Sequence, residues 1–126
     1  MKINEIAFVG YPVTDVQRAR GFYEGVLGLS TGEYDEEIKG MPGKYWIEYD
    51  IGGATLAISN TWEPAGQSQK GPSMALEVED LDEAIEKMKS SEVDFVSEKI
   101  ETPVCAFIMV ADPDGNPLTI HKRKNS

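Results

Sequence analysis

The chain has 126 residues, of which 40% are hydrophobic and 27% charged, and its formal net charge is −10 at pH 7. This composition is typical of a folded globular protein and excludes an intrinsically disordered one. A surface this acidic disfavours nucleic acid and anionic membranes as partners, because phosphate groups are held by Lys and Arg side chains. No apolar run in the sequence reaches the ~20 residues that a membrane-spanning helix needs.

The N-terminus and the cysteine content indicate the compartment. The opening MKINEIAFVG lacks the apolar region and cleavage site of a signal peptide. The single cysteine, Cys105, excludes an intrachain disulfide, which agrees with a reducing environment. We therefore expect a cytoplasmic protein.

The first elements along the chain are a strand region and a helix. Residues 3–13 (INEIAFVGYPV) are rich in β-forming residues, and residues 14–28 (TDVQRARGFYEGVLG) carry an apolar stripe at helical spacing. Thr14 and Gln17 have the spacing of a capping box. Gly28 is placed to end the helix.

A polar segment and a hairpin follow the helix. Residues 30–44 (STGEYDEEIKGMPGK) are polar and contain several glycines, so we predict a loop there. Residues 45–50 and 54–60 are strand-like and are separated by a glycine-containing turn, which predicts a hairpin. Residues 61–72 (TWEPAGQSQKGP) are the best candidate for a linker.

The second half begins with a strand at 73–79 and a helix at 80–91. Asp80 and Glu83 have cap spacing at the start of that helix. The remaining predicted elements are strands at 93–100 and 104–111, a turn at 112–116 and a closing strand at 117–122.

The two halves correspond to each other in register. Residues 8–15 (FVGYPVTD) align with 73–80 (SMALEVED), and residues 49–59 (YDIGGATLAIS) align with 111–121 (ADPDGNPLTIH). Internal similarity of this kind takes priority over local patterns. It predicts two βαβββ modules, each too small to bury its sheet face alone.

The predicted fold class is therefore α+β. We expect one domain, 1–126, made of modules at about 1–60 and 73–126 that pair their curved mixed sheets around a shared concave cavity. The sequence leaves open whether the modules pair within one chain or across a swapped dimer.

The opening FVGYPVTDVQRARGFYEGVLGL and the closing DPDGNPLTI together resemble the vicinal oxygen chelate superfamily. This group contains glyoxalase I, the bleomycin- and fosfomycin-resistance proteins and the extradiol dioxygenases. The resemblance implies the paired βαβββ fold and a homodimer. It also implies a small-molecule partner on the concave face.

Members of this superfamily typically hold a divalent metal through four side chains, usually His, Glu or Gln. Carried over to this sequence, the four ligand positions are Phe8, Ala57, Ser73 and Thr119. Phe and Ala have no lone pair to donate, and Ser and Thr hydroxyls are weak neutral ligands. We therefore expect no metal cofactor, and no metal-dependent activity of the glyoxalase I or fosfomycin-transferase kind.

Alternation along the strands extends the candidate site beyond these four positions. If Thr119 faces the cavity, His121 does too, as does Ser59 at the matching place in the first module. Likewise Glu77 shares a face with Ser73. Trp46 and Glu48 are expected inward, because the apolar Ile47 between them suits the helix side.

Four of these residues have side chains that could take part in a reaction, and each also has a purely structural interpretation. His121 is either a general base or hydrogen-bond donor at the cavity rim, or only the polar end of a strand. Glu48 and Glu77 are either a base or substrate anchor, or solvated carboxylates. Cys105 is either a nucleophile or a small strand residue beside the cavity, and nothing adjacent in sequence would activate it.

Our leading hypothesis is a protein that binds a small organic molecule in a metal-free cavity, by sequestration as in the bleomycin-resistance type. The expected lining is Phe8, Trp46, Ala57, Ser59, Ser73, Glu77, Cys105 and Thr119, with His121 and Glu48 as polar anchors. The alternative is a lyase, isomerase or dioxygenase-type enzyme that uses His121 or Glu48 as base. A metal site relocated to His121, Glu48 and Glu77, or a cavity filled by Phe8 with no ligand at all, stays open.

Overall fold

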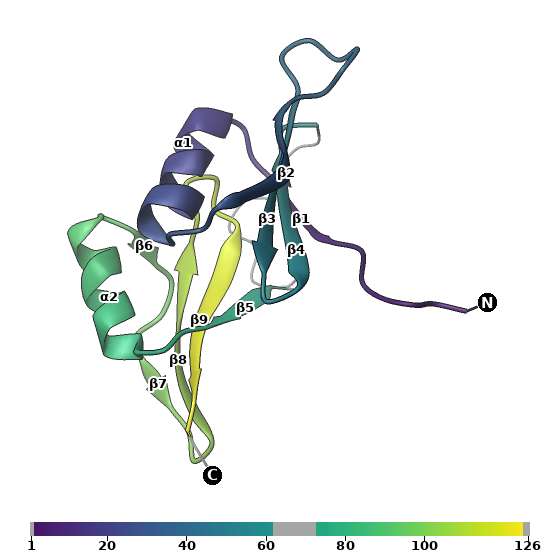
Figure 1. Ribbon diagram of the computed structural model, residues 1–126. Coiled ribbons are helices and arrows are strands. Elements are labelled where there is room, and N and C mark those ends of the chain that lie inside the picture. The colour runs from purple at the N-terminus through teal and green to yellow at the C-terminus, as the bar shows by residue number, and fades with distance from the viewer. Residues whose placement is uncertain (1, 62–72, 125–126) are drawn as a thin grey trace. The chain divides into compact units, whose positions relative to one another are not determined.

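The computed structural model describes residues 2–61 and 73–124, so the predicted linker lies, apart from Thr61, outside the described residues. The chain divides into two compact units, Met1–Pro64 and Ala65–Ser126. Figure 1 shows the elements of each. Each unit combines one mixed sheet with a helical segment, which confirms the α+β class.

Unit 1 is built on a sheet of strand order β1-β4-β3-β2. β1 pairs with β4 in parallel, and the other neighbours are antiparallel. Its elements are β1 (Val9–Pro12), α1 (Val16–Arg20), the π-helical η1 (Gly21–Val26), β2 (Thr31–Glu37), β3 (Tyr45–Ile51) and β4 (Ala54–Ser59).

Unit 2 repeats this plan with strand order β5-β9-β8-β6 and a short β7 that pairs with β8. β5 and β9 are parallel, like β1 and β4 in unit 1. Its elements are β5 (Met74–Glu77), α2 (Leu81–Ser90), β6 (Asp94–Phe95), β7 (Ile100–Glu101), β8 (Cys105–Ala111) and β9 (Pro117–Arg123).

The registers of the two parallel pairs are equivalent. Gly10 lies opposite Ala57 in unit 1, and Ala75 lies opposite Thr119 in unit 2. The alignment of the two halves matches Gly10 with Ala75 and Ala57 with Thr119. The repeat in the sequence is therefore also a repeat in the way the parallel strands pair within each sheet.

The predicted loop at 30–44 is wrong in its first half, which forms β2. β2 is the outer strand of the sheet and pairs only with β3, through an irregular register between Thr31 and Asp35. An edge strand exposes its side chains, so it need not show the apolar alternation from which strands are predicted. This explains why a strand with mostly acidic and glycine residues was not recognised.

Three other boundaries differ from the prediction. Within the predicted strand region 3–13 only Val9–Pro12 is a strand, and residues 2–8 are exposed. The predicted strand at 93–100 is two short strands, β6 and β7, separated by residues 96–99. Both short strands pair with β8, at opposite ends of it.

The first helix begins at a different cap than predicted. The Asp15 carboxylate accepts a hydrogen bond from the Arg18 backbone N–H at 3.0 Å, so Asp15 and not Thr14 is the N-cap. Thr14 instead accepts a hydrogen bond from the Arg18 guanidinium. The predicted end at Gly28 is confirmed, since Gly28 has φ +73°, a left-handed conformation that favours glycine. In α2 the predicted cap is confirmed, because Asp80 Oδ1 accepts from the Glu83 N–H at 3.0 Å.

A buried polar network ties η1 to the sheet of unit 1. The fully buried Tyr49 donates from its hydroxyl to Glu24 at 2.8 Å, and Arg20 donates to the same carboxylate at 2.7 Å. Burial alone would raise the pKa of Glu24, but the hydrogen bonds from Arg20 and Tyr49 lower it below its ordinary value. Burial and the Glu24 carboxylate raise the pKa of Tyr49. Glu24 therefore stays ionised and holds η1 against β3.

Candidate ligand-binding faces

The sheet of unit 1 has two chemically different faces. One face carries the core residues Ile47, Tyr49, Leu56 and Ile58, each at most 1% exposed. Because side chains alternate along a strand, Trp46 and Glu48 belong to the opposite face. The register agrees, since Trp46 lies opposite Ser59 and Glu48 lies opposite Ala57.

Three of the predicted residues are in contact on this second face. The rings of Phe8 and Trp46 meet edge to face, with centroids 5.2 Å apart and planes at 90°. The Trp46 indole N–H donates to Glu48 Oε2 at 2.8 Å. Phe8 keeps 45% of its surface exposed, whereas Trp46 and Glu48 are half-buried. The structure thus joins an aromatic pair to a carboxylate at the surface of unit 1.

Ala57 and Ser59 lie on the same face but are fully buried. The Ser59 hydroxyl donates to the Tyr45 carbonyl at 2.7 Å, and it also contacts Thr61 Oγ1 and accepts from the Thr61 N–H. These bonds make Ser59 a structural residue at the end of β4. The role of Ala57 and Ser59 as ligand contacts remains a prediction.

The corresponding face of unit 2 holds a carboxylate–imidazole pair. His121 lies opposite Glu77 across the parallel β5–β9 ladder, and His121 Nδ1 is 2.6 Å from Glu77 Oε1. The other oxygen, Glu77 Oε2, accepts a hydrogen bond from the Arg123 backbone N–H at 2.7 Å. The Phe107 ring stacks on the imidazole, with centroids 6.4 Å apart and planes at 19°. The imidazole is therefore oriented from two sides.

The Glu77 carboxylate is ionised at neutral pH. The hydrogen bond from the Arg123 backbone and the one from His121 hold its pKa below the ordinary value. An ionised carboxylate only accepts hydrogen bonds, so His121 Nδ1 is the donor. In the neutral imidazole Nε2 then carries the lone pair, which is the arrangement of a general base.

The other predicted residues of unit 2 are less engaged. Ser73 is exposed, and Thr119 is half-buried opposite Ala75. Cys105 shares the face of Phe107 by alternation, and its Sγ lies 3.2 Å from Thr102 Oγ1. Thr102 Oγ1 also accepts from the Cys105 N–H, so this contact belongs to the turn before β8.

Two residues of these faces were not predicted. Glu36 lies opposite Trp46 in the β2–β3 ladder and therefore on the face of Trp46, and Phe107 stacks on His121. The sequence does not indicate Glu36, because residues 30–44 have the polar, glycine-containing composition of a loop. Phe107 lies in the apolar run VCAFIMVA, in which no polar residue shows which face is which. Because Phe107 is two residues after Cys105, strand alternation places both side chains on the same face.

The profile of the Glyoxalase/Bleomycin resistance protein/Dioxygenase superfamily matches residues 2–120. The chain belongs to this superfamily. The match covers residues of both units and confirms the resemblance read from the sequence. Membership of this superfamily does not by itself fix an activity.

The chain is similar to one curated protein in sequence and to solved structures in fold. "Uncharacterized protein YetH" of Bacillus subtilis (strain 168) is 30% identical over 116 residues, covering 90% of this chain and 94% of YetH. TnmS3, an antibiotic binding protein from Streptomyces sp. CB03234, has a TM-score of 0.76 at 22% identity, covering 98% of this chain and 99% of its own. The fosfomycin resistance protein FosX from Listeria monocytogenes has a TM-score of 0.80 at 17% identity, covering 98% and 96%. The two structures share the fold.

The residues at the superfamily's metal positions do not fit a divalent ion. Phe8 and Ala57 are hydrocarbon side chains, and Phe8 is engaged with Trp46. Ser73 and Thr119 offer only neutral hydroxyls. Within residues 2–61 and 73–124, no group of three or more His, Cys, Asp or Glu is arranged to hold a metal. In the same residues no helix is both long enough and apolar enough to cross a membrane.

Proposed function

We propose that this protein binds a small organic molecule in the cytoplasm without a metal ion. The observation that carries the proposal is the cluster of Phe8, Trp46 and Glu48 on the sheet face opposite the core. An exposed aromatic ring fixed against a second ring gives apolar contact area, and a nearby carboxylate gives polar anchoring. The exposed fraction of Phe8, 45%, counts against the alternative in which Phe8 only fills the interior.

One structural neighbour supports sequestration as the mode of action. TnmS3, which shares the fold, is described as an antibiotic binding protein. Binding alone requires a pocket and no reacting groups, which suits a chain whose four metal positions are Phe8, Ala57, Ser73 and Thr119. We therefore expect the ligand of this chain to be an organic molecule that the protein binds and does not transform.

The test is a thermal-shift screen of the full chain against a panel of apolar organic compounds, in EDTA and in buffer without chelator. Because binding to the folded state alone raises the melting temperature, a ligand is expected to stabilise the protein equally in both buffers. Metal analysis of protein purified without chelator should find well under one ion per chain. About one tightly held ion per chain, or stabilisation seen only without EDTA, would overturn the proposal.

A second candidate function is proton transfer by His121, which the Glu77 contact favours. The imidazole is held by the carboxylate at 2.6 Å and by the Phe107 ring, and its side chain stays 24% exposed. A base oriented in this way suits a lyase or isomerase that removes a proton next to a carbonyl group. If this reading holds, His121→Ala abolishes turnover of a bound compound and leaves its binding intact.

We also propose a homodimer. The proposal is supported by large apolar side chains that unit 1 leaves exposed near its N-terminus, among them Ile3 and Ile6, each 80% exposed. Large apolar side chains exposed this close together in the sequence are typical of surfaces that pair. Light scattering coupled to size exclusion should give twice the chain mass of 13.9 kDa, and Ile3→Ser with Ile6→Ser should lower it. A monomer at all concentrations would contradict the proposal.

A further inference from the structure

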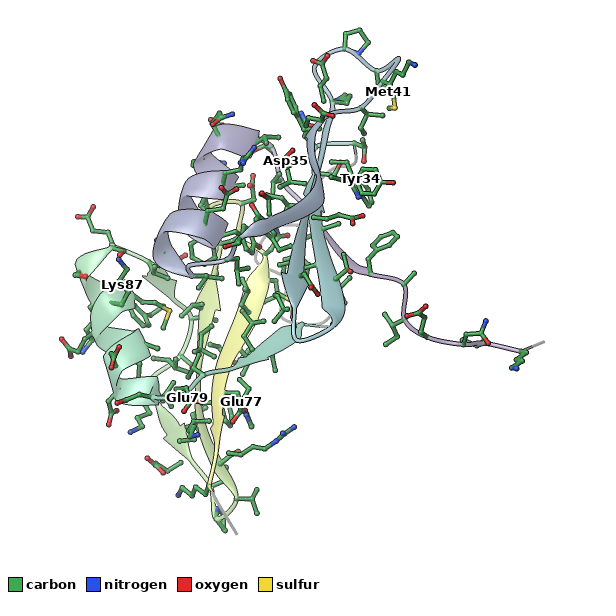
Figure 2. The ribbon with its side chains drawn as sticks, viewed as in Figure 1. Tyr34, Asp35, Met41, Glu77, Glu79 and Lys87 are labelled. Atoms are coloured by element: carbon green, nitrogen blue, oxygen red, sulfur yellow. The ribbon has the colours of Figure 1, made fainter. Side chains whose placement is uncertain are left out.

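Aromatic side chains lie on the second face of unit 1, which is the sheet face opposite the core. Phe8 and Trp46 are in edge-to-face contact. Tyr34, 55% exposed, comes from β2, two residues before Glu36. Figure 2 shows Tyr34 and Asp35 on opposite sides of β2, with Asp35 on the side of α1. Three aromatic rings from the segment before β1, from β2 and from β3 therefore belong to one face.

Two carboxylates accompany these rings. Glu36 lies opposite Trp46 in the ladder, and Glu48 accepts the hydrogen bond of the Trp46 indole. Among the described residues neither carboxylate has a Lys, Arg or His within salt-bridge distance. Lys44, the lysine closest in sequence to Trp46, donates instead to the Asn60 carbonyl at 3.2 Å. The local charge is thus negative and uncompensated by an ion pair.

The hydrogen bond to Glu48 also changes the character of the indole. When an indole N–H donates to a negatively charged acceptor, electron density shifts toward the ring. The ring face is then more negative and attracts a cation more strongly. Carboxylates beside an aromatic pair are complementary to a positive charge on an apolar body.

We propose that the face formed by Phe8, Tyr34, Glu36, Trp46 and Glu48 binds an organic cation, a positively charged group carried on an apolar or aromatic body. This inference rests on the proposed small-molecule binding and names its ligand class. The rings contact the apolar body, and the carboxylates lie beside the charge. An anion of the same shape meets two like charges and is rejected.

The probes that test this are tetraphenylphosphonium and tetraphenylborate, which have the same shape and opposite charge. Calorimetric titration of the full chain should give saturable binding of tetraphenylphosphonium. Tetraphenylborate should bind at least about tenfold more weakly. Equal or tighter binding of tetraphenylborate would overturn the cation proposal while leaving metal-free binding of small molecules standing.

Substitutions locate the binding. Glu36→Gln and Glu48→Gln should each weaken tetraphenylphosphonium binding about threefold, and both together about tenfold. Tyr34→Ala removes an exposed ring and should weaken it without affecting folding. The control is Asp35→Asn, which changes the net charge by the same amount on the opposite side of β2 and should weaken binding far less than Glu36→Gln does.

The outcomes are separable. If Asp35→Asn weakens binding as much as Glu36→Gln does, the attraction comes from the net charge of the molecule, and the site assignment is wrong. If neither probe binds but the thermal-shift screen finds a neutral ligand, the cation proposal fails and the proposed function survives. If neither probe binds and the screen finds nothing, both fail.

Discussion

At the scale of single residues, the two sheet faces use their carboxylates differently. Glu77 orients an imidazole, whereas Glu48 accepts from an indole. Glu24 of η1 stabilises the fold of unit 1 by accepting hydrogen bonds from Tyr49 and Arg20. The surroundings of each carboxylate, and not its residue type, decide whether it supports binding, proton transfer or stability.

The Glu77 contact predicts which nitrogen of His121 carries the proton. Nitrogen NMR of the neutral imidazole should show the proton mainly on Nδ1, because the ionised Glu77 accepts there. His121 is the chain's only histidine, so its signals need no assignment. In Glu77→Gln the Nδ1–H form should decline, while Glu79→Gln, two residues further along, should leave it in place. A wild-type protein with mainly Nε2–H would contradict this contact.

The Tyr49 hydroxyl predicts a stability effect. Tyr49→Phe leaves the buried side of Glu24 without one donor, so it should lower the free energy of unfolding by about 1–2 kcal/mol in urea denaturation. The matched control is Tyr34→Phe, which removes an exposed hydroxyl and should change the stability by less than about 0.5 kcal/mol. Equal effects of the two variants would show that the Glu24 network contributes nothing.

The lowered pKa of Glu24 predicts the pH dependence of the same network. A carboxyl group with a lowered pKa in the folded state stabilises the fold fully above its unfolded pKa, and this stabilisation is lost as the pH falls through the folded value. Glu24→Gln should therefore be less stable than wild type at pH 7, and the difference should shrink once the pH drops below the ordinary value of 4.5. A difference that grows on acidification would contradict the network.

At the scale of elements, the strongly periodic segments were predictable and the edge strand was not. The stripe of α2 and its cap at Asp80 could be predicted from spacing alone. β2 could not, because Glu36 and its neighbours on an exposed edge are mostly polar and show no apolar alternation with a period of two. For the same reason, Glu36 could not be predicted as a residue of the candidate site. Glu77 with His121 was predictable as a shared face, but the 2.6 Å contact was not, since alternation gives no distances.

The cap of α1 offers a test at this scale. Asp15→Ala removes the acceptor for the Arg18 N–H and should lower the stability by about 1 kcal/mol. Thr14→Ala, at the cap expected from the sequence, removes an exposed contact to the Arg18 guanidinium and should cost less than half as much. Urea denaturation of both variants distinguishes them. A larger loss from Thr14→Ala would restore the capping box at Thr14.

At the scale of the whole molecule, most of the fold could be predicted from the internal repeat of the sequence. Matching the two halves predicted two modules, and the parallel pairs Gly10 with Ala57 and Ala75 with Thr119 repeat that match. Phe8, Ala57, Ser73 and Thr119, at the positions where the resemblance expects metal ligands, offer two hydrocarbon side chains and two neutral hydroxyls, so metal-free binding stays a proposal. The net charge of −10 predicts that binding of a cation weakens as salt is added.

The central claim is binding of a small organic molecule without a metal. The most direct measurement is a pair of calorimetric titrations of the full chain with tetraphenylphosphonium, before and after dialysis against EDTA. The account predicts one site per chain with the same affinity in both titrations. Loss of binding after EDTA, with recovery on adding one equivalent of a divalent metal, would contradict it.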